Sequence, residues 1–99
     1  MIIISEVSYP VESVREVVKR FSELPALPDF ISMQGPYGIS TVGVGFRTIA
    51  IYEFDDSKYT EANEILQKRY ATYIGVPGFT YSANIWMEAA EAIKILGLD

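Results

Sequence analysis

The chain has 99 residues, a formal net charge of −5, and neither histidine nor cysteine. This composition excludes disulfides and thiolate chemistry, and it removes the commonest acid–base and metal-binding side chain. Hydrophobic residues make up 49%, which is too many for a disordered chain and generous for a small monomer. We therefore expect one domain over residues 1–99, with some apolar surface that meets a partner.

The distribution of charge limits the kinds of partner. The eight Lys and Arg residues form no basic block, so we expect neither nucleic acid nor an anionic membrane surface as a partner. The N-terminal MIII lacks a basic region and is too short for a signal peptide or a membrane span. We therefore predict a cytoplasmic protein.

Residues 2–8 (IIISEVS) are rich in β-branched side chains and predict a first strand. Residues 10–24 predict an amphipathic helix, because apolar side chains recur there at helical spacing: Val11, Val14, Val18 and Phe21. Residues 29–34 predict a second strand. The next stretch, GPYG at residues 35–38, carries strand breakers, and we interpret it as a bulge or bend at the rim of the sheet.

Residues 41–45 (TVGVG) predict a turn, and residues 46–54 (FRTIAIYEF) predict the clearest strand. Asp55, Asp56 and Ser57 are N-cap candidates for a second helix that runs to about Ile74. One face of this helix carries apolar or aromatic side chains that predict packing: Tyr59, Ala62, Leu66, Tyr70 and Tyr73. Gly75 suits the position after the helix C-terminus.

Residues 79–87 predict a fourth strand and residues 88–97 a final helix. The resulting β-α-β-β-α-β-α order predicts an α+β fold, ferredoxin-like with an extra C-terminal helix, and a four-stranded antiparallel sheet covered by helices on one face. The other face is apolar and aromatic, which favours a homodimer. Two such faces can close a barrel whose interior holds one small ligand.

The element order over the whole chain, with the local stretches GPYG, IAIYEFDD and VPGFTYSANIW, resembles the dimeric α+β barrel superfamily. That superfamily includes cofactor-free monooxygenases, lactone isomerases, haem enzymes and ligand-sensing domains of transcription regulators. It also has many members with no known activity, and the chain is most similar to these. The resemblance implies a homodimer built around a barrel.

Strand residues on one predicted face are candidates for ligand contacts. Thr80, Ser82, Asn84 and Trp86 form a polar row that ends in an indole, which suits a pocket with one apolar wall and a few hydrogen bonds. The alternative is that this row faces solvent or a dimer seam. Tyr37, at the predicted rim, either covers the cavity or packs on the neighbouring subunit.

Glu53 and Arg47 are the weak catalytic candidates, and both are also candidates for ligand binding. A buried Glu53 could act as a general base, but such a residue more often pairs with an arginine or caps a helix. Arg47 could clamp a ligand carboxylate with two hydrogen bonds, or it could pair with Glu6 or Glu53.

We expect no cofactor and no metal. The absence of His and Cys removes the usual haem ligands, and Asp55 with Asp56 suits a helix cap better than a metal site. GPYGISTVGVG lacks the Lys-Ser/Thr of a P-loop. The leading hypothesis is a homodimeric small-molecule-binding protein with an apolar or carboxylate ligand in the barrel. The alternatives are a cofactor-free monooxygenase or isomerase, and a structural dimer without a ligand.

Overall fold

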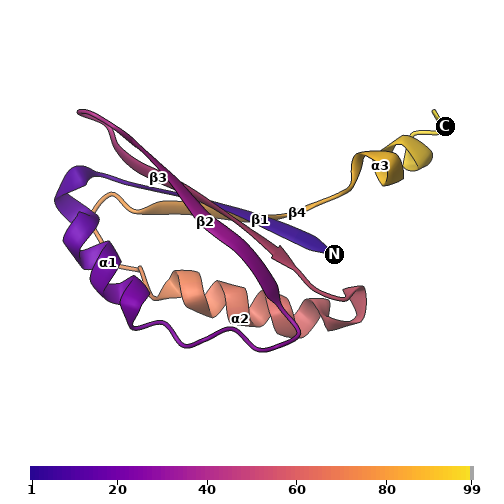
Figure 1. The fold of residues 1–99 in the computed structure, drawn as a ribbon, viewed down its shortest axis with the longest axis horizontal. Coiled ribbons are helices and arrows are strands. Elements are labelled where there is room, and N and C mark those ends of the chain that lie inside the picture. Colours follow the sequence, from indigo (N-terminus) through magenta and orange to yellow (C-terminus); the bar gives the residue numbers. More distant parts are fainter. Residues whose placement is uncertain (99) are drawn as a thin grey trace.

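The computed structural model describes residues 1–98, which form a four-stranded antiparallel sheet and three α-helices (Figure 1). The strands are β1 (Ile2–Tyr9), β2 (Ser32–Thr41), β3 (Gly45–Glu53) and β4 (Thr80–Trp86). The helices are α1 (Val14–Ser22), α2 (Tyr59–Ala71) and α3 (Ala89–Ile95), and short 3-10 turns, η1 (Val11–Ser13) and η2 (Asp56–Lys58), precede α1 and α2. The predicted α+β class and four-stranded antiparallel sheet are confirmed.

The sheet has the strand order β2-β3-β1-β4, and each pair of neighbours is antiparallel. Ile3 of β1 lies opposite Tyr52 of β3 and opposite Ile85 of β4, which sets the register of the three strands. Helices α1 and α2 lie on the same side of the sheet, whereas α3 extends away from it beyond the end of β4 (Figure 1). The opposite side of the sheet is therefore uncovered, and we call it the open face.

The main core lies between the sheet and α2. Ala62, Leu66 and Tyr70 of α2 are buried against Ile3 and Tyr52 of the sheet. A smaller cluster joins Val17 of α1 to Tyr73 and Val76, just beyond α2. The predicted packing face of the second helix is confirmed, because apolar side chains at helical spacing turn together toward the sheet.

Asp55 caps the 3-10 turn η2, which precedes α2, whereas the N-cap residue of α2 itself, Lys58, makes no side-chain capping bond. Asp55 accepts hydrogen bonds from the backbone N–H and the hydroxyl of Ser57, and these bonds hold the pKa of the Asp55 carboxyl below its ordinary value. The helix ends at Ala71 instead of Ile74, because the next amides bond three residues back, as Tyr73 N does to Tyr70 O at 3.0 Å. Gly75 has φ +94°, but it lies four residues beyond Ala71, so the prediction that it directly follows the helix C-terminus was wrong.

The first helix differs from its prediction. Its α-helical part is shorter than residues 10–24, because residues 11–13 form a 3-10 turn and Leu24 N bonds back to Phe21 O at 3.2 Å. Val17 is the helix residue that is buried, whereas Val18 and Phe21 are exposed. Of the residues at helical spacing that predicted this helix, Val18 and Phe21 therefore do not pack in the core, which takes Val17 instead.

The GPYG stretch lies within β2 and does not end it. The register with β3 shifts between Gln34 and Tyr37, so the predicted bulge is confirmed. The strand begins at Ser32 and continues to Thr41, beyond the predicted end at residue 34, because pairing resumes when Tyr37 meets Ile49. The bulge leaves Pro36 out of the ladder, where its missing N–H costs no pairing.

Candidate functional site

The open face collects all five residues that the sequence nominated for ligand binding. Strand alternation places the side chains of Arg47 and Glu53 on the same side of β3, and those of Asn84 and Trp86 on that side of β4. Tyr37 of β2 pairs with Ile49, whose side chain lies on the same side of β3 as Arg47 and Glu53, so Tyr37 belongs to this face too. The five side chains are exposed in a single chain, and Trp86 is 55% exposed.

The two catalytic candidates do not meet. Arg47 and Glu53 are six residues apart on one strand, which separates their backbones by about 20 Å. In the strand register, Glu53 lies opposite Ile2 of β1 at one end of the face, and Arg47 lies opposite Ser8 at the other end. No ion pair within 4.0 Å joins Arg47 to another residue of the described part, 1–98. Glu53 is exposed, so the buried environment expected for a general base is absent within one chain.

A shallow hollow lies on the Arg47 side of the open face. Its volume is about 220 Å³, and Arg47, Glu6, Ser8, Thr80 and Ser82 contribute to its lining. Part of the predicted polar row therefore lines a depression, whereas Asn84 and Trp86 do not reach it.

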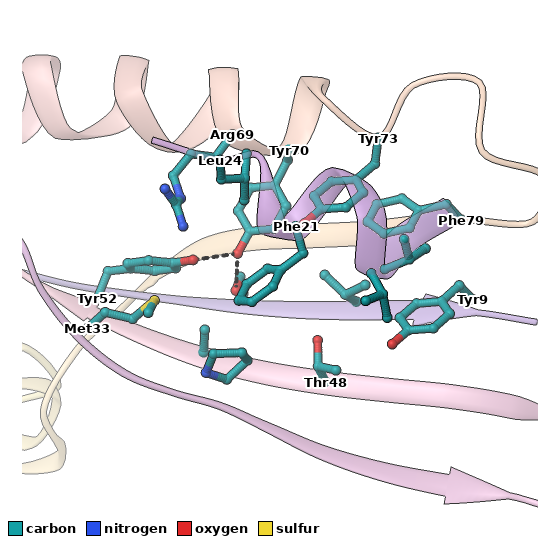
Figure 2. Close-up of a pocket in the computed structure, with 16 residues that line it drawn as sticks. Tyr9, Phe21, Leu24, Met33, Thr48, Tyr52, Arg69, Tyr70, Tyr73 and Phe79 are labelled. Carbon is teal, nitrogen blue, oxygen red and sulfur yellow. Dashed lines mark hydrogen bonds between the residues drawn. The ribbon is translucent and has the colours of Figure 1, made fainter. Parts of the chain in front are cut away.

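A second, apolar pocket lies on the opposite side of the sheet, between α1 and the strands (Figure 2). Its volume is about 180 Å³. Buried residues such as Ala50 and Val17 form its base, whereas the exposed side chains of Val18, Phe21 and Met33 mark its mouth between α1 and β2. The pocket exists because α1 buries its Val17 side and leaves its Val18 and Phe21 side uncovered.

Three hydroxyl groups form a chain in this pocket. The hydroxyls of Tyr52 and Tyr70 are 2.9 Å apart, and Tyr70 donates to the Oγ of Ser5 (Figure 2). Since the single hydroxyl proton of Tyr70 goes to Ser5, Tyr52 is the donor in its contact with Tyr70. All three side chains are buried, and burial raises the pKa of the Tyr70 phenol far above its ordinary value. The protons of Tyr52 and Tyr70 are thus used within these hydrogen bonds, and the two phenol oxygens can offer a ligand only acceptor lone pairs.

Stacked aromatic rings form the far wall. The ring centroids of Tyr73 and Phe79 are 4.6 Å apart with an angle of 10° between the planes, and Tyr9 stacks on Phe79 at 6.3 Å. Burial raises the pKa of the Tyr73 and Tyr9 phenols. These three nearly parallel rings make this side of the pocket apolar and aromatic.

The β2 bulge contributes one residue to the pocket and the next residue to the open face. Pro36 lines the pocket, whereas the next residue, Tyr37, belongs to the open face with Ile49. The GPYG stretch therefore shapes both surfaces.

Sequence reasoning did not nominate this pocket. It assigned Tyr70 and Tyr73 to packing, and it did not consider Ser5, Tyr52 or Arg69 as site residues. One signal was available for Ser5: it is a small polar residue at a position where alternation from Ile3 predicts burial. Nothing local signalled its contact with Tyr70, which lies 65 residues later in the chain.

Within residues 1–98, the structure has no group of three or more His, Cys, Asp or Glu side chains that could hold a metal ion. None of the helices in this part has both the length and the apolar character needed to cross a membrane. No protein-family model matches the chain, and neither a curated protein nor a solved structure matches it significantly.

Proposed function

We propose that the protein is a homodimeric small-molecule-binding protein. The observation that carries this proposal is the apolar pocket beneath α1, about 180 Å³ in volume, with a hydroxyl chain and an aromatic wall. An apolar cavity with a small number of placed polar groups is the usual form of a small-molecule site. The pocket is open at Val18 and Phe21, so a ligand can enter without unfolding the chain.

A neutral probe tests this part of the proposal. We expect toluene to bind wild-type protein, detected by saturation-transfer NMR and by shifts of ring resonances of Phe21 and Phe79. Val18→Trp, which fills the mouth, should abolish the signal. Val44→Trp is the control, because Val44 is an exposed valine outside the pocket lining. Absence of toluene binding, or equal binding to both variants, would contradict the assignment of the pocket.

The proposed assembly is a dimeric α+β barrel of ferredoxin-like chains. The order β1-α1-β2-β3-α2-β4, combined with the sheet order β2-β3-β1-β4, supports the ferredoxin-like arrangement. The open face supports the dimer, because it carries exposed or half-buried apolar side chains at Ile2, Ile4, Tyr37, Ile39, Ile49, Ile51 and Trp86. A second copy of the chain would cover this surface.

Light scattering tests the assembly. We expect a mass of about twice 11.1 kDa at micromolar concentration, and a shift of Trp86 emission to shorter wavelength as the dimer forms. A mass that stays at 11.1 kDa would contradict the homodimer. Trp86 is the only tryptophan, so its emission reports on this face alone.

The barrel interior is a second proposed position for a ligand. The hollow at Arg47, Ser8 and Thr80 supports it, since two open faces brought together would enclose this depression. The cofactor-free enzyme has less support, because Glu53 is exposed and lies far from Arg47 along β3. Arg47→Gln should weaken a ligand held in the barrel, while toluene binding beneath α1 stays unchanged.

A further inference from the structure

Arg69 is the only charged side chain among the sixteen residues that line the pocket beneath α1. Its guanidinium lies beside Leu24, on the side of the pocket where Tyr52 lies (Figure 2). No carboxylate belongs to the lining, so the fixed charge of this cavity is positive. The remaining lining residues are apolar or carry hydroxyl groups.

The charge of Arg69 is not neutralised within the described part of the chain. Its Nη1 donates to the carbonyl oxygen of Pro25 at 2.7 Å, and no ion pair within 4.0 Å involves it among residues 1–98. Two other cationic side chains on the helices are neutralised by ion pairs, Arg20 with Glu16 at 2.8 Å and Lys68 with Glu64 at 3.0 Å. Arg69 therefore has donors to spare at the edge of an apolar cavity.

The cavity also limits the size of a ligand. An engineered apolar cavity of about 150 Å³ binds benzene, so the volume of about 180 Å³ accommodates one ring with a short side chain. The aromatic wall formed by Tyr73 and Phe79 offers apolar contact to such a ring. The hydroxyls of Tyr52 and Tyr70 lie in the same pocket, but their protons are already donated to Tyr70 and Ser5, so the donor for an anionic group is Arg69.

We propose that this pocket binds a small monocarboxylate, with one ring or a short alkyl chain in the apolar part and the carboxylate on Arg69. This inference rests on the proposed small-molecule function and adds the chemical class of the ligand. Arginine fits the role, because its planar guanidinium matches the two oxygens of a carboxylate.

The net charge of −5 opposes an anion only at long range. Charges on the surface beyond roughly 8 Å are screened at physiological ionic strength, whereas a carboxylate bound to Arg69 at the edge of the pocket is at contact distance. The charge of Arg69 therefore decides whether the site prefers an anionic or a neutral ligand, and the net charge of the protein affects mainly the rate of association.

The test compares two probes that differ in charge but share their shape, phenylacetate and phenylacetamide. Calorimetry on wild-type protein should give at least about tenfold tighter binding for the acid, since a charge-assisted bond replaces a neutral one. Arg69→Gln should bring the ratio of the two affinities to near one. Arg15→Gln is the control, because Arg15 is exposed on α1 and does not line the pocket, and it should keep the wild-type ratio.

A wild-type ratio near one overturns the carboxylate inference, and so does a high ratio that persists in Arg69→Gln. Toluene binding separates this failure from failure of the proposed function: if toluene binds while the ratio is one, only the ligand class is wrong. If toluene, the acid and the amide all fail to bind, both proposals fall.

Should Arg69→Gln not fold, because it loses the bond to Pro25, Arg69→Lys decides. It keeps the charge and should keep a preference for the acid, and equal affinities in Arg69→Lys overturn the inference.

Discussion

The hydroxyl groups of Tyr52 and Tyr70 lie 2.9 Å apart in the buried part of the molecule, although the first belongs to β3 and the second to α2. Tyr70 donates onward to Ser5 of β1. Three elements are thus linked by one hydrogen-bonded chain that also borders the pocket. A buried polar chain of this kind stabilises one arrangement of its elements, because a displaced member leaves polar groups without partners.

The first prediction concerns this chain. Tyr70→Phe removes the central hydroxyl and leaves two buried groups unpaired, so it should lower the free energy of unfolding by about 1–3 kcal/mol. Tyr52→Phe should cost less, because it removes only the terminal member. Urea unfolding measures both, with Tyr59→Phe as the control, since the hydroxyl of Tyr59 makes no hydrogen bond within residues 1–98. Equal stability of wild type and Tyr70→Phe would show that the chain contributes nothing.

The second prediction concerns alkaline pH. Burial raises the pKa of Tyr9, Tyr70 and Tyr73 above the ordinary phenol value of 10.0. Above that value the unfolded chain has lost phenolic protons that the folded chain keeps, so the free energy of unfolding should fall as the pH rises. Urea unfolding at several pH values checks the slope, and phenolate absorbance should show a late group of tyrosines. Tyr70→Phe should reduce the slope, and stability that is independent of pH above 10 would contradict the burial of these phenols.

The third prediction uses two glycines with positive φ, Gly43 in the turn between β2 and β3 and Gly45 at the first position of β3. A Cβ on Gly45 would lie against the backbone carbonyl of Tyr9, whereas one on Gly43 would meet nothing within 4 Å. Gly45→Ala should therefore lower the free energy of unfolding by more than about 3 kcal/mol. Gly43→Ala should cost only the conformational strain, about 1 kcal/mol. Similar losses in the two variants would show that the approach of Tyr9 to this turn is not close.

The fourth prediction concerns Tyr37 and the proposed dimer. Tyr37 projects from the β2 bulge on the open face and is exposed in a single chain. Tyr37→Ala should weaken the dimer by about 2 kcal/mol or more, because exposed aromatic side chains carry much of the energy of an interface. Sedimentation at several concentrations measures the change, with Ile74→Ala, an exposed residue beyond α2, as the control. If Tyr37→Ala leaves the dimer dissociation constant unchanged but alters toluene binding, the bulge shapes only the pocket and not the dimer interface.

Local patterns in the sequence were enough for most of the fold. Alternation along residues 46–54 places Arg47 and Glu53 on one side of the strand and Ala50 and Tyr52 on the other, as in the structure, and the breakers in GPYG correctly predicted a bulge. The strand register of the structure then placed the nominated site residues on one face of the sheet. The first helix was less predictable, because a valine at position 17 or 18 has the same intrinsic preference for burial.

The sequence by itself determined the order of the elements and which side chains share a face of each strand. Both are consequences of the backbone repeat, which is a local property of neighbouring residues. The tertiary structure decided where a cavity forms, because that depends on which side of α1 reaches the sheet. It also decided that Ser5 meets Tyr70 and that Arg69 is left without a carboxylate, since these contacts join residues far apart in the chain. The spacing of residues along a strand or helix carries no information about which distant side chain will lie opposite.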